Sequence, residues 1–166
     1  MSLASCSRPA AVAAVVFACS GCDIDTDAAV FVEPSIASPS ATVGTTAFGT
    51  TLSGGFTLKL HLGPRATDPS TVSLGAFSLL GSDQKTQHVS PLEVASTTTF
   101  PVTVDIDGDA SADFTFDTGN APLPKEKAAE LCGAGGLVVS GVIQDSLQSG
   151  GSTPVYSPVF DPAGCP

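Results

Sequence analysis

Residues 56–62, Phe-Thr-Leu-Lys-Leu-His-Leu, alternate strictly between apolar and polar side chains. Successive side chains of a β-strand point to opposite faces of the sheet, so this pattern indicates one buried and one solvated face. A Gly-Pro pair ends the run, because neither residue favours the interior of a strand. The segment therefore predicts a half-buried strand with Thr57, Lys59 and His61 on its solvated face.

Similar short runs recur along the chain, separated by Gly, Pro and Asp residues that favour turns. Their spacing of about 8–14 residues gives about eight strands, which is typical of an antiparallel β-sandwich of immunoglobulin-like type. A β-barrel or a jelly roll is the alternative. A parallel α/β sheet would need several crossover helices, and only residues 124–132 predict a helix. The other predicted strands are residues 29–37 with 40–43, 72–80, 88–94, 100–106, 114–116, 137–143 and 155–160.

Proline residues restrict where the first strand can lie. Pro34 and Pro39 interrupt it, and proline cannot donate a hydrogen bond to a sheet ladder. We therefore expect this strand at the edge of a sheet or at a crossing between sheets.

The composition favours one folded domain and argues against nucleic acid as a partner. Hydrophobic residues make up 42% of the 166 residues, which is enough for a core and too many for a disordered chain. Charged residues make up only 13%, and acidic residues outnumber basic ones to give a formal net charge of −10. Such a chain repels phosphates, so nucleic acid is not expected as a partner.

The N-terminus has the layout of an export signal. Arg8 precedes an apolar run over residues 9–18. A helix needs about twenty apolar residues to span a bilayer, so this run is too short for a transmembrane anchor. Its length fits the apolar region of a signal peptide.

Residues 18–22, Ala-Cys-Ser-Gly-Cys, resemble a bacterial lipobox. The resemblance implies that Cys22 carries lipid and becomes the mature N-terminus, although Cys19 departs from the usual aliphatic residue. Cys19 is the alternative lipidated residue, in the frame 16–19, and a plain secretory signal cut after Ala18 is a further alternative.

The lipobox resemblance sets the expected organisation and location. Residues 1–21 are the signal peptide, residues 22–28 an acidic tether and residues 29–166 a single sandwich domain. The lipid would hold the protein on a bacterial membrane in the cell envelope, with the outer membrane favoured over the inner one. Two lipid signals are enough for stable anchoring.

Cys132 and Cys165 remain after the leader is removed. An even pair in an oxidising compartment predicts a disulfide. A metal-binding or catalytic thiol is the alternative, but neither cysteine has another Cys or a His nearby in the sequence.

Residues 104–113 contain a run of acidic residues at alternate positions. Calcium prefers six to eight oxygen ligands, and a tight loop can direct alternate carboxylates inward. The candidate Ca²⁺ ligands are Asp105, Asp107, Asp109, Ser111 (through its carbonyl) and Asp113.

This stretch resembles the β-hairpin calcium loops of integrin-type FG-GAP repeats, which implies a structural calcium ion. Ala110 stands where those loops usually have glycine, and the single copy excludes a propeller. The alternative is an acidic hairpin turn without a bound ion, because Asp-Gly is a favoured turn dipeptide in any case.

The sequence contains no G-x-S-x-G, H-E-x-x-H or P-loop motif. We therefore predict a non-catalytic envelope module, structural or protein-binding, that is stabilised by calcium. The alternative is a lipoprotein that binds a small ligand or glycan, and an enzyme is the third class. An exposed apolar surface favours the first, a deep polar pocket the second, and perturbed ionisable groups in that pocket the third.

Overall fold

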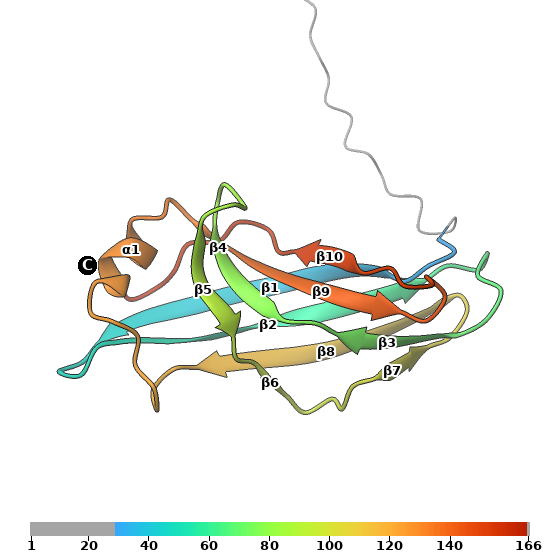
Figure 1. Cartoon of the computed structure of the whole chain (residues 1–166), viewed down its shortest axis with the longest axis horizontal. Helices are drawn as coiled ribbons and strands as arrows, with labels where there is room; N and C mark the ends of the chain where they lie inside the picture. Colours follow the sequence, from blue (N-terminus) through green and yellow to red (C-terminus); the bar gives the residue numbers. More distant parts are fainter. Residues whose placement is uncertain (1–28, 166) are drawn as a thin grey trace, which may run out of the picture.

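The computed structural model describes residues 29–165, which form two antiparallel sheets packed face to face (Figure 1). The predicted signal peptide, Cys19, Cys22 and the tether 22–28 lie outside these residues. Within residues 29–165, no helix has the length and apolar character to cross a membrane.

The first sheet has the strand order β1-β2-β8-β6. Its two long strands, β1 (Glu33–Thr45) and β2 (Thr50–Leu62), form a hairpin, and β8 (Gly108–Asp117) pairs with β2 along its whole length. The short strand β6 (Ala95–Ser96) pairs with β8 at the other edge of this sheet. β1 lies at the sheet edge, as its prolines predict.

The second sheet is centred on β9, which pairs with β10 along one edge and with β3 and β4 along the other. β3 and β4 replace the single predicted strand 72–80, because residues 75–76 interrupt it, although Gly75 N–H still donates to Val142 O of β9 at 2.7 Å. The strands of this sheet are β3 (Ser70–Leu74), β4 (Phe77–Gly81), β5 (Gln87–Leu92), β7 (Val102–Val104), β9 (Leu137–Asp145) and β10 (Thr153–Tyr156).

This topology confirms the predicted immunoglobulin-like sandwich. The row β1-β2-β8-β6 corresponds to strands A, B, E and D of that fold, and β3/β4, β9 and β10 correspond to C, F and G. Neither sheet closes into a barrel over the residues described.

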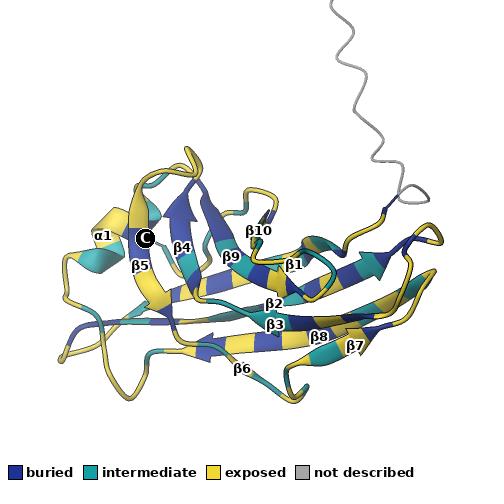
Figure 2. Ribbon diagram, turned by 45° about the vertical axis from the view of Figure 1, so that its right-hand side comes forward, coloured by how far each residue is buried: buried dark blue, intermediate teal, exposed yellow. Residues whose placement is uncertain are grey.

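The core lies between the sheets, and buried residues alternate with more exposed ones along much of β2 and β8 (Figure 2). In β2, Leu58, Leu60 and Leu62 are fully or almost fully buried, as the alternation predicts. An aromatic cluster joins the layers: the Phe114 ring lies 5.1 Å from that of Phe56 in the same sheet and 5.4 Å from that of Phe77 in the other.

The helix α1 (Lys127–Cys132) is shorter than the predicted 124–132, because residues 124–126 form a turn in which Lys127 N–H donates to Pro124 O. Cys132 at its end forms the predicted disulfide with Cys165, with the two Cα atoms 5.6 Å apart. Next to that bridge, Ala163 exchanges backbone hydrogen bonds with Ala41 and Val43 of β1, each at 2.8 Å. The disulfide therefore holds the C-terminal segment against the edge of β1.

Candidate functional site

The predicted calcium ligands lie in two different kinds of structure. Asp105 and Asp107 belong to the turn between β7 and β8, where Asp107 has a positive φ of 57°. Asp109, Ser111 and Asp113 lie at alternate, exposed positions of β8. The predicted loop over residues 105–113 is therefore wrong in its extent, since β8 begins at Gly108.

Two of these carboxylates contact side chains of β2. Asp109 Oδ1 forms a hydrogen bond with His61 Nδ1 at 2.8 Å, and Asp113 Oδ1 accepts one from Thr57 Oγ1 at 2.6 Å. Both contacts follow from the antiparallel register, which places His61 opposite Asp109 and Thr57 opposite Asp113. The acidic residues of β8 thus belong to a polar ladder on the outer face of the first sheet.

This arrangement does not fit a single calcium site. Residues four apart on a strand lie about 13 Å apart, whereas calcium–oxygen distances are about 2.4 Å. Among residues 29–165, no group of three or more His, Cys, Asp or Glu side chains is placed to hold a metal ion. Calcium binding stays a prediction. A calcium-specific rise in the unfolding temperature that is lost in D107N/D109N would support it.

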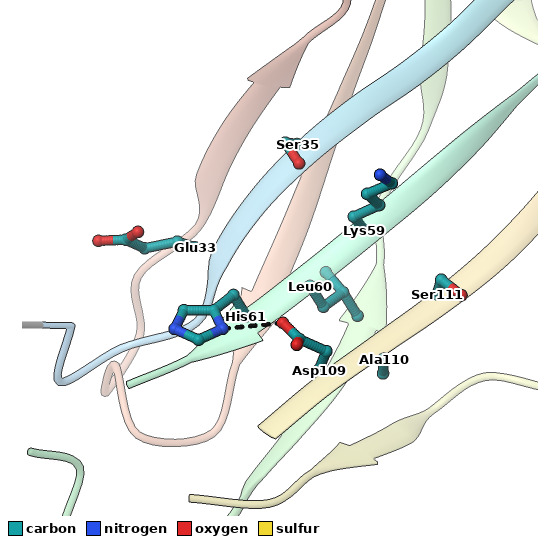
Figure 3. A pocket seen from close by; sticks show the side chains of 8 residues that line it. All are labelled: Glu33, Ser35, Lys59, Leu60, His61, Asp109, Ala110 and Ser111. Atoms are coloured by element: carbon teal, nitrogen blue, oxygen red, sulfur yellow. Dashed lines mark hydrogen bonds and ion pairs between the residues drawn. The ribbon is translucent and has the colours of Figure 1, made fainter. Parts of the chain in front are cut away.

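A shallow groove of about 520 Å³ lies on the same outer face (Figure 3). His61 lies on this face as predicted, but its side chain is only 26% exposed. The groove carries charges of both signs close together, from one lysine and two carboxylates. Its lining residues are Glu33, Ser35, Lys59, Leu60, His61, Asp109, Ala110 and Ser111.

His88 lies apart from this groove and joins β5 to α1. It is 8% exposed, and its Nδ1 forms a hydrogen bond with Glu130 Oε1 at 2.8 Å. Lys127 Nζ also donates to the Glu130 carboxylate at 2.7 Å. The hydrogen bond from Lys127, followed by that from His88, lowers the pKa of Glu130 below its usual value.

Asp83, in the turn between β4 and β5, gives a pH-dependent prediction. The N–H groups of Lys85 and Thr86 donate to Asp83 Oδ1 at 2.9 Å, and with the Thr86 hydroxyl they lower the pKa of Asp83 from 3.8 to about 2. Because the folded pKa lies below the unfolded one, this carboxylate stabilises the fold above pH 3.8, and the contribution is lost as the pH falls toward 2. We expect the NMR titration midpoint of Asp83 near 2 and a shallower acid destabilisation in D83N; a midpoint near 3.8 would contradict this.

Asp145 is a buried acidic residue that the sequence does not reveal. It is 5% exposed, and its carboxylate accepts hydrogen bonds from Val32 N at 2.7 Å, from Leu147 N at 2.9 Å and from the Ser70 hydroxyl. These bonds fix the start of the domain against the ends of β3 and β9. A buried carboxylate with three donors is satisfied, so we assign Asp145 a structural role.

No family model matches the chain, and no curated protein matches it. Among solved structures, the chain is similar to the ASH / PapD-like domain of human CEP192 (PapD-like domain 7), with 14% identity, 97% of each chain covered and a TM-score of 0.29.

Proposed function

We propose that this chain is an exported, lipid-anchored protein of the bacterial cell envelope whose sandwich domain is a non-catalytic module that binds another protein. The export leader and the lipobox-like residues before Cys22 support the location. The bond between Cys132 and Cys165 is of the kind that persists in oxidising compartments outside the cytosol.

The observation that carries the binding role is Phe48, whose side chain is 90% exposed at the tip of the β1–β2 hairpin. The tip is held by hydrogen bonds: Thr46 N–H donates to Gly49 O at 2.8 Å, and Phe48 N–H donates to Thr46 Oγ1 at 3.2 Å. An aromatic side chain on a fixed turn loses little entropy on binding, and such anchors often dominate interface energies.

The position of Phe48 suits a membrane-anchored protein. The described chain begins at Ala29, at the end of the sandwich opposite the hairpin tip (Figure 1). β1 contains 13 residues, and at about 3.3 Å per residue it carries the chain roughly 40 Å along the domain. A lipid at Cys22 would therefore leave Phe48 at the end directed away from the bilayer.

The test is site-specific photo-cross-linking in living cells. A benzophenone amino acid at position 48 is expected to capture a discrete protein, whereas the same group at Tyr156, which is 44% exposed in β10 of the second sheet, is expected not to capture it. No adduct at position 48, or the same adducts at both positions, would refute the binding role. The intact mass of the native protein, with C22S and C19S as controls, tests the lipid separately.

The groove on the outer face of the first sheet favours the second candidate function, a lipoprotein that binds a small polar ligand. Lys59 and the His61–Asp109 pair offer donors and acceptors within one groove. In that case K59A would abolish ligand binding, while F48A would leave it unchanged.

A further inference from the structure

β8 has two edges that differ sharply in their pairing. Along one edge, all its residues from Gly108 to Asp117 pair with β2. Along the other edge, only Phe114 and Thr115 pair, with Ser96 and Ala95 of β6. Over the residues that the structure describes, no strand is hydrogen-bonded to residues 108–113 on this edge; β7 lies beside the start of β8 but pairs with β3 (Figure 1).

The topology explains why this edge is open. After β6 the chain leaves the first sheet, and its next strand, β7, pairs with β3 in the second sheet. No backbone hydrogen bond from elsewhere in residues 29–165 reaches residues 108–113 on this side. Since alternate residues of an edge strand direct their N–H and C=O groups outward, this edge offers a ladder of backbone donors and acceptors.

From this edge we propose that residues 108–113 bind an extended, lysine- or arginine-rich segment of a partner protein as an added β-strand. The inference rests on the proposed protein-binding function and adds to the Phe48 hairpin a second contact surface, on β8, and the chemistry of the partner segment that binds there. Strand addition takes its affinity from main-chain hydrogen bonds and its specificity from alternate side chains.

The side chains on this part of β8 favour a basic strand. Asp109, Ser111 and Asp113 are exposed on the outer face, and the Asp109 side chain is 82% exposed. Residues directly opposite each other on paired strands have Cβ atoms about 4.5–5.5 Å apart, so lysines at alternate positions would lie beside the two carboxylates. On the inner face Ala110 is half-buried and Ala112 is buried, so inward-pointing side chains of an added strand would have to be small.

The same charges argue against a second copy of this chain as the occupant. Two β8 edges pairing antiparallel about Ser111 would place Asp109 of each copy opposite Asp113 of the other. Like charges directly opposite each other destabilise a strand pair. The acidic edge therefore disfavours pairing with a second copy in this register and favours a basic segment.

The test uses the full-length protein in detergent and a nine-residue peptide in which lysine alternates with threonine and valine. We expect the peptide to slow hydrogen exchange at alternate amides of residues 108–113. A peptide with glutamate for lysine, and one with N-methylated backbone amides, are each expected to bind at least tenfold more weakly. The N-methylated peptide keeps the charges, so it separates strand addition from attraction alone.

Charge reversal gives the matched protein variants. D109K/D113K is expected to lose affinity for the lysine peptide at least tenfold and to gain it for the glutamate peptide. D68K/D161K changes the net charge equally at exposed positions elsewhere and is expected to leave the affinity for the lysine peptide within twofold.

Three results would overturn the inference: no binding of the lysine peptide, equal binding of its N-methylated form, or binding without protection of residues 108–113. If the edge fails in this way while the adduct at position 48 persists, the inference falls and the protein-binding function stands. If the adduct at position 48 is also absent, both fall.

Discussion

Replacing Phe114 with alanine is expected to lower the free energy of unfolding by about 3–5 kcal/mol. Phe114 is 3% exposed, and its ring packs against those of Phe56, Phe77 and Phe100 at centroid distances of 5.1, 5.4 and 5.8 Å. These partners come from both sheets and from the connection before β7. The substitution would abolish all three ring contacts of Phe114 and leave a cavity between the two sheets.

The matched control is Phe48→Ala, the same substitution at a side chain that is 90% exposed. Surface substitutions of this kind change stability by about 0.5 kcal/mol or less. Urea unfolding of the two variants, followed by circular dichroism, measures the difference. A loss under about 1 kcal/mol in F114A, or equal losses in both variants, would contradict the assignment of Phe114 to the core.

This pair also separates folding from function. If Phe48 is an interface anchor, F48A keeps the stability of the wild type but no longer binds the partner. F114A, in contrast, is less stable than the wild type while its hairpin tip is unchanged in sequence. A stable F48A protein that still bound its partner with undiminished affinity would count against the proposed hairpin site.

How much of the fold the sequence predicts depends on how strictly apolar and polar residues alternate along each strand. Residues 56–62 show a full alternation and fall within β2, but the pattern does not extend to residues 50–55, where Gly54 and Gly55 stand. Gly54 is needed there because a Cβ would overlap the carbonyl oxygen of Ser40 at the bulge of β1. Glycine selected for such a close approach carries no strand signal in the sequence.

The first half of β8 escapes prediction for a related reason. Residues 108–113 are Gly-Asp-Ala-Ser-Ala-Asp, none of which favours a strand by propensity. They become a strand because β2 offers a complete partner, with Leu62 opposite Gly108 and Thr57 opposite Asp113. Tertiary pairing thus overrides local preference, and the acidic run that predicts a loop forms an open sheet edge.

The candidate sites also differ in how far the local sequence predicts them. The disulfide follows from cysteine count and compartment alone, and the structure forms it. The exposure of Phe48 and the burial of Asp145 depend on long-range packing, so no residue near them in the sequence announces either. Most phenylalanines are expected in the core, and Phe48 departs from that expectation because it lies at the tip of a hairpin.

Removing the disulfide in C132A/C165A is expected to lower the free energy of unfolding by about 3–4 kcal/mol, because the bridge closes a loop of 34 residues in the unfolded chain. A local effect should accompany this loss. The bridge holds the C-terminal segment, in which Ala163 N–H donates to Ala41 O and Ala163 O accepts from Val43 N–H, so the Ala163 and Val43 amides should exchange faster in the variant.

Reduction of the wild-type protein provides the control, since dithiothreitol should destabilise it to the level of C132A/C165A and leave the variant unchanged. Faster exchange at Val43 and Ala163, with β9 amides still protected, would show that the bridge keeps the C-terminal segment hydrogen-bonded to the edge of β1. A variant that unfolds within about 1 kcal/mol of the wild type would contradict the expected contribution of the closed loop. In that event the packing of α1, whose Leu131 is fully buried, would be enough to hold this end of the sandwich.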